Sequence, residues 1–119
     1  VQPVPRELTK QYGIVEVNGE HEKCPTIRSI VEKPDPQVAP STMAVIGRYV
    51  LEPEIFDSLR KIDRGAGGEI QLTDAIAREI PKGKTVACKY DGERFDCGSK
   101  QGFLNATVHY ARKEGYRII

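Results

Sequence analysis

The sequence predicts a single domain of the α/β or α+β class. Three apolar, β-branched runs come first along the chain, and two segments with helical periodicity follow them. Another apolar run and a last amphipathic segment complete the order β-β-β-α-α-β-α. Strands that come in a run and then alternate with helices are typical of this class.

Four strands are expected, at residues 12–17, 26–32, 43–51 and 84–90. Asn18-Gly19 follows the first and is a strong signal for a short hairpin turn. Pro34 ends the second and should hold Lys33 in an extended conformation. The third, "MAVIGRYVL", is nearly continuous and apolar, which suits a strand buried on both faces. Within it, Gly47 indicates a close approach or a bulge.

Three helices are expected. The first should begin at Pro53, a favoured first position, with one apolar stripe made of Ile55, Phe56, Leu59 and Ile62. "GAGG" at 65–68 breaks the chain before a second helix at about 72–80, which ends at Pro81 and Gly83. The last helix covers about 100–113, with Ser99 as N-cap and Gly115 near its C-terminus.

Composition excludes several classes of protein. The 119 residues carry 18 Lys and Arg against 17 Asp and Glu, so there is no basic excess of the kind that binds nucleic acid. The apolar runs are too short to cross a bilayer. Three widely spaced cysteines without a CxxC pair argue against a disulfide framework and a structural zinc site, so a reduced, cytoplasmic setting is expected.

"SIVEKPDP" at residues 29–36 is the first candidate site, because an apolar run ends there in an acid and a base. Lys33 is a point charge suited to a phosphate, and Glu32 could accept hydrogen bonds from sugar hydroxyls. Successive strand side chains face opposite ways, so both reach one ligand only if the backbone turns. From these residues alone, two solvated charges at a strand end are the favoured interpretation.

"RFDCG" is the second candidate. Asp96 lies between Phe95 and Cys97, two residue types that are usually buried, and a lone carboxylate there could bind Mg²⁺ together with phosphate oxygens. The alternative, that Asp96 positions the following helix, is equally well supported. Cys97 is interpreted as a small buried hydrophobe, because no histidine lies near it in sequence. The glycine run of "GAGGEI" follows a helix instead of a strand, so an interhelical turn is favoured over a phosphate loop.

Three signals in chain order, "YGIV", "VEKP…APS…AVIGRYVL" and "GGEIQLTDAI…FDCGSKQG", together resemble bacterial UTP–glucose-1-phosphate uridylyltransferases across residues 11–113. The resemblance implies the C-terminal part of a Rossmann-like nucleotidyltransferase fold, a mixed sheet with flanking helices. It also implies UTP and glucose 1-phosphate as substrates, UDP-glucose and pyrophosphate as products, and Mg²⁺ as cofactor.

The resemblance also assigns site residues. Lys33 would neutralise the sugar phosphate as the catalytic cation, and Asp96 would help hold the metal. The sugar itself would be bound by Gly13, Glu32, Val45 and Tyr49. With this implication, the functional interpretation of "EKP" becomes the favoured one.

The chain departs from the family pattern in one respect. The glycine-rich basic loop that grips the triphosphate does not occur in residues 1–119, so the chain is expected to be the sugar-phosphate half and to be inactive alone. A thymidylyltransferase fragment and a non-catalytic binding module stay open as alternatives. Family members are commonly homo-oligomers, so self-association is expected, and no nucleic-acid or membrane partner is.

Overall fold

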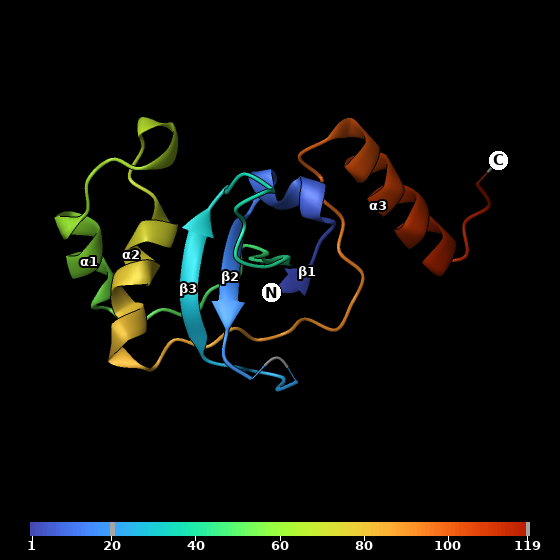
Figure 1. Cartoon of the computed structure of the whole chain (residues 1–119). Coiled ribbons are helices and arrows are strands. Elements are labelled where there is room, and N and C mark those ends of the chain that lie inside the picture. The colour runs from blue at the N-terminus through green and yellow to red at the C-terminus, as the bar shows by residue number, and fades with distance from the viewer. Residues whose placement is uncertain (20, 119) are drawn as a thin grey trace.

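The computed structural model describes residues 1–19 and 21–118. Within them, one four-stranded sheet has the order β1-β4-β2-β3. Figure 1 labels three of its strands, β1, β2 and β3. Every pairing is antiparallel. The expectation of a mixed sheet is therefore wrong for this part of the chain, although strands and helices do combine as an α/β mixture. The strands are β1 Gln2–Pro3, β2 Gly13–Val17, β3 Ile27–Glu32 and β4 Met43–Ala44.

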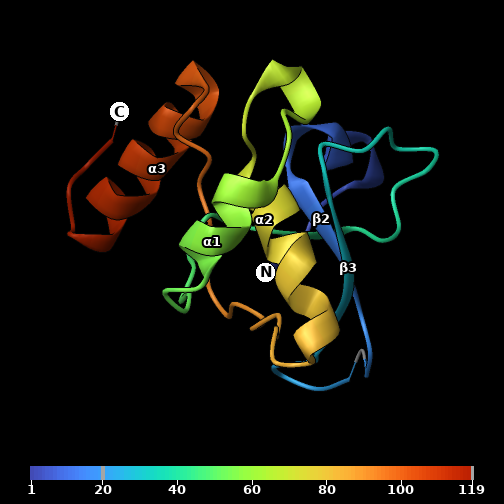
Figure 2. The same cartoon turned by 90° about the vertical axis from the view of Figure 1, so that its left-hand side faces the viewer.

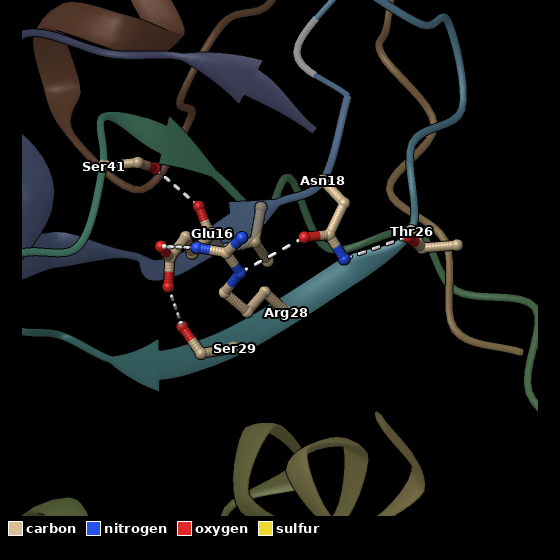
Figure 3. A network of polar contacts seen from close by, with 7 residues as sticks. Glu16, Asn18, Thr26, Arg28, Ser29 and Ser41 are labelled. Atoms are coloured by element: carbon tan, nitrogen blue, oxygen red, sulfur yellow. Dashed lines mark hydrogen bonds and ion pairs between the residues drawn. The ribbon is translucent and has the colours of Figure 1, made fainter. Parts of the chain in front are cut away.

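The hairpin of β2 and β3 forms as the sequence predicts, but its turn is longer than two residues. The connection runs from Asn18 to Thr26, and Glu20 lies outside the described residues. The Arg28 guanidinium ties the two strands together by donating to Glu16 at 3.1 Å and to Asn18 at 3.2 Å (Figure 3). Because Asn18 in turn donates to the Thr26 hydroxyl, polar side chains hold the wider loop closed.

Two of the four predicted strands do not form as expected. Of residues 43–51 only Met43–Ala44 pair, and Val50 is fully exposed, so that run is not buried on both faces. Gly47 has a φ of +76° and open space where a Cβ would stand, which is neither a close approach nor a bulge. Residues 84–90 form no strand, although they pair with residues 23–27 through three backbone hydrogen bonds, two of which make the isolated bridge of Thr26 with Val86. Both segments have strand composition, but neither has a neighbour that pairs along its whole length.

The helices agree closely with expectation: α1 covers Ile55–Lys61, α2 covers Leu72–Glu79 and α3 covers Lys100–Lys113. The first begins two residues after Pro53, and Phe56 is exposed instead of belonging to the buried stripe. Ser99 caps α3 by accepting from the Gly102 N–H at 3.0 Å, and Gly115 takes a φ of +83° just past its end. The 3₁₀ turns are Arg6–Gln11, Ala66–Gly68 and Ile80–Lys82.

The core lies between the sheet and the first two helices. Figures 1 and 2 show α1 and α2 together on the β3 side of the sheet. Val15 and Ile30 of the hairpin pack there against Ile55 of α1 and Ile76 of α2. The apolar faces predicted from helical and strand periodicity therefore meet in one cluster, which fixes where β3 ends relative to α2.

The last helix projects from this core. None of its residues is buried, and Phe103 and Leu104 are more than half exposed. The radius of gyration is 16.4 Å, against about 13.5 Å for a compact domain of this length. A tilted ring contact between Phe95 and His109, with centroids 5.0 Å apart, joins α3 to the segment before it.

Within residues 1–19 and 21–118, no helix combines the length and apolar character needed to span a membrane.

Candidate functional site

The backbone turns sharply where β3 ends. Lys33 has a φ of +46°, so the expectation that Pro34 holds it extended is wrong. Its N–H donates to the Tyr12 carbonyl at 3.0 Å, which stabilises a conformation that is unfavourable for a residue other than glycine. The turn brings the Lys33 Nζ to 4.0 Å from the Glu32 Oε1. The acid and the base therefore reach the same side, as binding of one ligand by both requires.

Glu32 is held by a residue that the sequence analysis missed. The Thr73 hydroxyl of α2 donates to the Glu32 Oε2 at 2.5 Å. The side chain of Glu32 is only 15% exposed, so this bond fixes one carboxylate oxygen and leaves the other toward Lys33. Thr73 belongs to the "QLTDAI" stretch, but only the packing of α2 on β3 shows its role.

Gly13 lies opposite Glu32 in the β2–β3 register. A Cβ on Gly13 would stand 3.2 Å from the Glu32 Oε2 and 3.5 Å from the Thr73 hydroxyl. Glycine therefore leaves the room that the fixed carboxylate occupies.

Val45 and Tyr49 lie close to this group. The Val45 N–H donates to the Gly13 carbonyl at 2.8 Å. Partial burial raises the pKa of the Tyr49 phenol, and the negative charge of Glu32 raises it further. Backbone pairing and hydrogen bonds thus join Gly13, Glu32, Lys33 and Val45, whereas Tyr49 is linked to them only through the effect of the Glu32 charge.

Asp96 is organised by Tyr12, 84 positions earlier in the chain. The Tyr12 hydroxyl donates to the Asp96 Oδ2 at 2.9 Å, and the Gly98 N–H donates to Oδ1 at 3.0 Å. Arg94 donates to the same hydroxyl at 3.3 Å and lies 4.9 Å over the Tyr12 ring. These interactions hold the pKa of Asp96 below its usual value. The hydrogen bond from Tyr12 has the largest effect, followed by the bond from Gly98 and the positive charge of Arg94.

A cleft of about 1050 Å³ contains Asp96 and Val45. Gly13, Glu32, Lys33 and Tyr49 are not among its lining residues. Tyr12 joins the two regions, because its carbonyl accepts from Lys33 and its hydroxyl donates to Asp96. Basic side chains (Lys23, Arg48, Lys89 and Arg94) and acidic ones (Asp91, Glu93 and Asp96) both line this cleft, so their charges nearly balance.

The surroundings of Asp96 differ from the expected buried segment. Phe95 is only half-buried and Cys97 is exposed, so the interpretation of Cys97 as a buried hydrophobe is wrong. Among the described residues, no cluster of three or more His, Cys, Asp or Glu side chains could hold a metal. An ionised, exposed Asp96 still fits the one carboxylate that Mg²⁺ uses when phosphate oxygens supply other ligands.

Replacing Tyr12 by phenylalanine should raise the pKa of Asp96, because the largest cause of its depression is removed. A depressed carboxyl pKa contributes stability above the unfolded-state pKa, and this contribution is lost as pH falls through the folded-state value. The variant should therefore be less stable than wild type at neutral pH, and the two stabilities should converge in acid. Carboxyl-carbon NMR titration measures the pKa directly. Tyr116→Phe, at a residue that is 70% exposed, is the control, and an unchanged Asp96 pKa in Tyr12→Phe would refute the assignment.

Comparison with known proteins gives the family. The family model described as nucleotidyl transferase matches residues 1–113. A UTP–glucose-1-phosphate uridylyltransferase of Pseudomonas aeruginosa is 44% identical over 107 residues, which are 90% of this chain and 38% of that protein. One of Komagataeibacter xylinus is 51% identical over 100 residues, 84% of this chain and 35% of that protein. The chain thus spans somewhat over a third of these relatives' length.

Solved structures agree. A UDP-glucose pyrophosphorylase complexed with UDP-glucose superposes with a TM-score of 0.89 at 38% identity, over 94% of this chain and 42% of that one. The UTP-bound enzyme of Acinetobacter baumannii gives 0.74 at 40% identity, over 94% of this chain and 38% of that one. These likenesses confirm that the chain folds like part of a UDP-glucose pyrophosphorylase, as the sequence motifs imply. With its family model matched over residues 1–113, the chain belongs to the nucleotidyl transferase family.

Proposed function

We propose that this chain supplies the sugar-phosphate side of a UTP–glucose-1-phosphate uridylyltransferase. That enzyme converts UTP and glucose 1-phosphate to UDP-glucose and pyrophosphate. The names of the relatives at 44% and 51% identity support the uridylyl reaction over the thymidylyl alternative. The observation that carries the proposal is the turn after β3, where Glu32 and Lys33 reach the same side within 4.0 Å.

The chemistry asked of these residues is positioning and charge neutralisation. In the proposed reaction an oxygen of the sugar phosphate attacks the α-phosphorus of UTP and displaces pyrophosphate in line. The Lys33 ammonium would offset the charge of the sugar phosphate, and the Glu32 oxygen that Thr73 does not bind would accept hydrogen bonds from sugar hydroxyls. Gly13, which leaves this region uncrowded, would let the hexose approach the backbone of β2.

A magnesium ion fits this arrangement with Asp96 as its protein ligand. The low pKa of Asp96 keeps it ionised at neutral pH, and its hydrogen bonds from Tyr12 and Gly98 orient it. Bound Mg²⁺ would neutralise charge on the phosphates. Arg94, stacked on Tyr12, would hold the aromatic ring that carries the orienting hydroxyl.

The nucleotide side of the site, the activity of the chain alone, its assembly and its location are predictions. We infer that the triphosphate is gripped by parts of the enzyme outside this chain, which would make this the C-terminal part and leave it inactive alone. Self-association and a cytoplasmic setting also stay predictions. Support for this inference comes from the sequence of residues 1–119, which contains no P-loop pattern and whose "GAGG" run follows a helix instead of a strand.

Titration with glucose 1-phosphate, followed by two-dimensional amide NMR, tests the proposal. We expect shifts confined to Gly13, Glu32, Lys33, Val45 and Tyr49, with much weaker responses to glucose alone. With UTP and Mg²⁺ added, pyrophosphate release should stay at background. A folded chain that responds to neither glucose 1-phosphate nor the nucleotide would favour the non-catalytic module, and pyrophosphate release at an enzyme-like rate would overturn the half-site interpretation.

A further inference from the structure

Two of the three cysteines, Cys24 and Cys88, lie side by side on the surface. The Cys24 and Cys88 Sγ atoms are 3.0 Å apart, although the residues are 64 positions apart in sequence. Both are free thiols on exposed residues. Cys97, the third cysteine, lies beside Asp96 and makes its hydrogen bond to the Phe95 carbonyl instead.

The backbone around the pair is an antiparallel ladder that falls short of a strand. Ala87 N–H donates to the Pro25 carbonyl at 2.8 Å, and Lys89 N–H donates to the Lys23 carbonyl at 2.9 Å. These two bonds flank Cys24 and Cys88, which therefore form a non-hydrogen-bonded pair with Cα atoms about 4.5 Å apart. That spacing lies at the short end of the disulfide range, about 4.4–6.8 Å. Closing the sulfur–sulfur bond needs side-chain rotation more than backbone movement.

We propose that Cys24 and Cys88 form a reversible dithiol–disulfide site that reacts with small-molecule disulfides. One cysteine thiolate attacks a sulfur of the reagent, forms a mixed disulfide and expels the first thiolate. The second cysteine then loses its proton to solvent and attacks the protein sulfur, which expels the second thiolate. Two protein thiols are oxidised, and one reagent disulfide is reduced to two thiols. Such reversible disulfides are the kind found in reducing compartments.

Oxidation would fasten a weakly held segment. Residues 84–90 are joined to residues 23–27 by three backbone hydrogen bonds, two of which make the Thr26–Val86 bridge, without forming a strand. Lys23, Cys88 and Tyr90 also line the cleft that contains Asp96. A covalent link between Cys24 and Cys88 would therefore fix one wall of that cleft. This inference is independent of the proposed transferase function.

The reduced pair is expected to react slowly at neutral pH. The hydrogen bond to Cys88 raises the pKa of the Cys24 thiol, and desolvation and the Cys88 charge add to this. Lys23, itself paired with Asp91, and the terminal amine act in the opposite direction. Because the thiolate is the attacking form, incubations are best run near pH 8.5, roughly the pKa of a free cysteine.

The test is incubation of the chain with glutathione disulfide, followed by thiol counting under denaturing conditions and peptide mapping. Free thiols should fall from three to one, since the chain has three cysteines, and the intact chain should lose the mass of two hydrogens. Tryptic peptides 24–28 and 85–89 should appear linked. The unfolding temperature should rise by roughly 10 °C, because the closed loop is long, and reductant should reverse the change.

Matched variants decide the assignment. Cys97→Ser should keep the cross-link and the stabilisation, whereas Cys24→Ser should lose both. Peptides linked through Cys97, disulfide-bonded dimers, or glutathione retained separately on Cys24 and Cys88 would each overturn the proposal. An unfolding temperature that oxidation leaves unchanged would overturn the claim that the bond fastens the 84–90 segment.

Discussion

Replacing Lys33 with alanine is expected to weaken binding of glucose 1-phosphate about 10- to 150-fold, the loss of about 1.5–3 kcal/mol that accompanies removal of one charged hydrogen-bond partner. The turn after β3 holds the Lys33 Nζ near the Glu32 Oε1, on the side proposed for the sugar phosphate. Lys33 is also the one cation that the proposal assigns to this phosphate. The measurement is the NMR titration described above. Lys33→Arg keeps the charge in a different shape and should retain part of the affinity.

Two further variants separate binding from folding. Lys61→Ala removes an exposed lysine in the last turn of α1 and should leave affinity unchanged. Lys33→Gly removes the same ammonium but relieves the cost of the φ of +46°, so the chain should become about 1 kcal/mol more stable while affinity is lost. Undiminished affinity in both Lys33→Ala and Lys33→Gly would remove this residue from the site.

Replacing Gly102 with alanine is expected to destabilise the chain by about 1–3 kcal/mol and to displace Asp96. Gly102 lies in the first turn of α3, where a Cβ would stand 1.8 Å from the Asp96 carbonyl oxygen. Backbone cannot yield as a flexible side chain does, so either the helix or the Asp96 segment must move. In an open helix position the same substitution would stabilise by about 1 kcal/mol, so the sign of the change is diagnostic.

Urea unfolding measures the stability of Gly102→Ala, and the carboxyl-carbon signal of Asp96 reports its displacement. The pKa of Asp96 should rise toward its usual value, because the bonds from Tyr12 and Gly98 depend on its position. Gln101→Ala, at the exposed neighbouring position of the same helix, is the matched control and should change neither quantity. A stabilised Gly102→Ala with an unshifted Asp96 would show that the close approach does not exist.

Much of the fold follows from local sequence. The α3 bounds 100–113 come directly from a serine N-cap, a basic last turn and a glycine after it, and all three signals act within one helix. The β2–β3 hairpin follows in the same way from alternation on either side of a turn signal. Residues 45–51 and 84–90 have equally good strand composition, but a strand also needs a neighbour that pairs along its length, and residues 84–90 find only a partial one in residues 23–27. Composition cannot say whether one is there.

The candidate site likewise contains residues that the motifs predict and residues that only the packing of distant elements reveals. Motif order was enough to single out Gly13, Glu32, Lys33, Val45, Tyr49 and Asp96, whose roles stay predictions. Motif order did not reveal the residues that hold Glu32 and Asp96, which are Thr73, Tyr12 and Arg94. Their contacts join residues far apart in the chain, since Thr73 and Glu32 are 41 positions apart and Tyr12 and Asp96 are 84 positions apart. Pairings of this kind depend on where whole elements pack.

The chain by itself determined the helix limits, the hairpin and the family motifs, since caps, periodicity and motif order are properties of neighbouring residues. Only the tertiary structure decided that Lys33 leaves the extended region, that Cys24 meets Cys88, and which apolar runs become strands. Each of these depends on a hydrogen-bond partner or packing surface supplied from a distant part of the sequence.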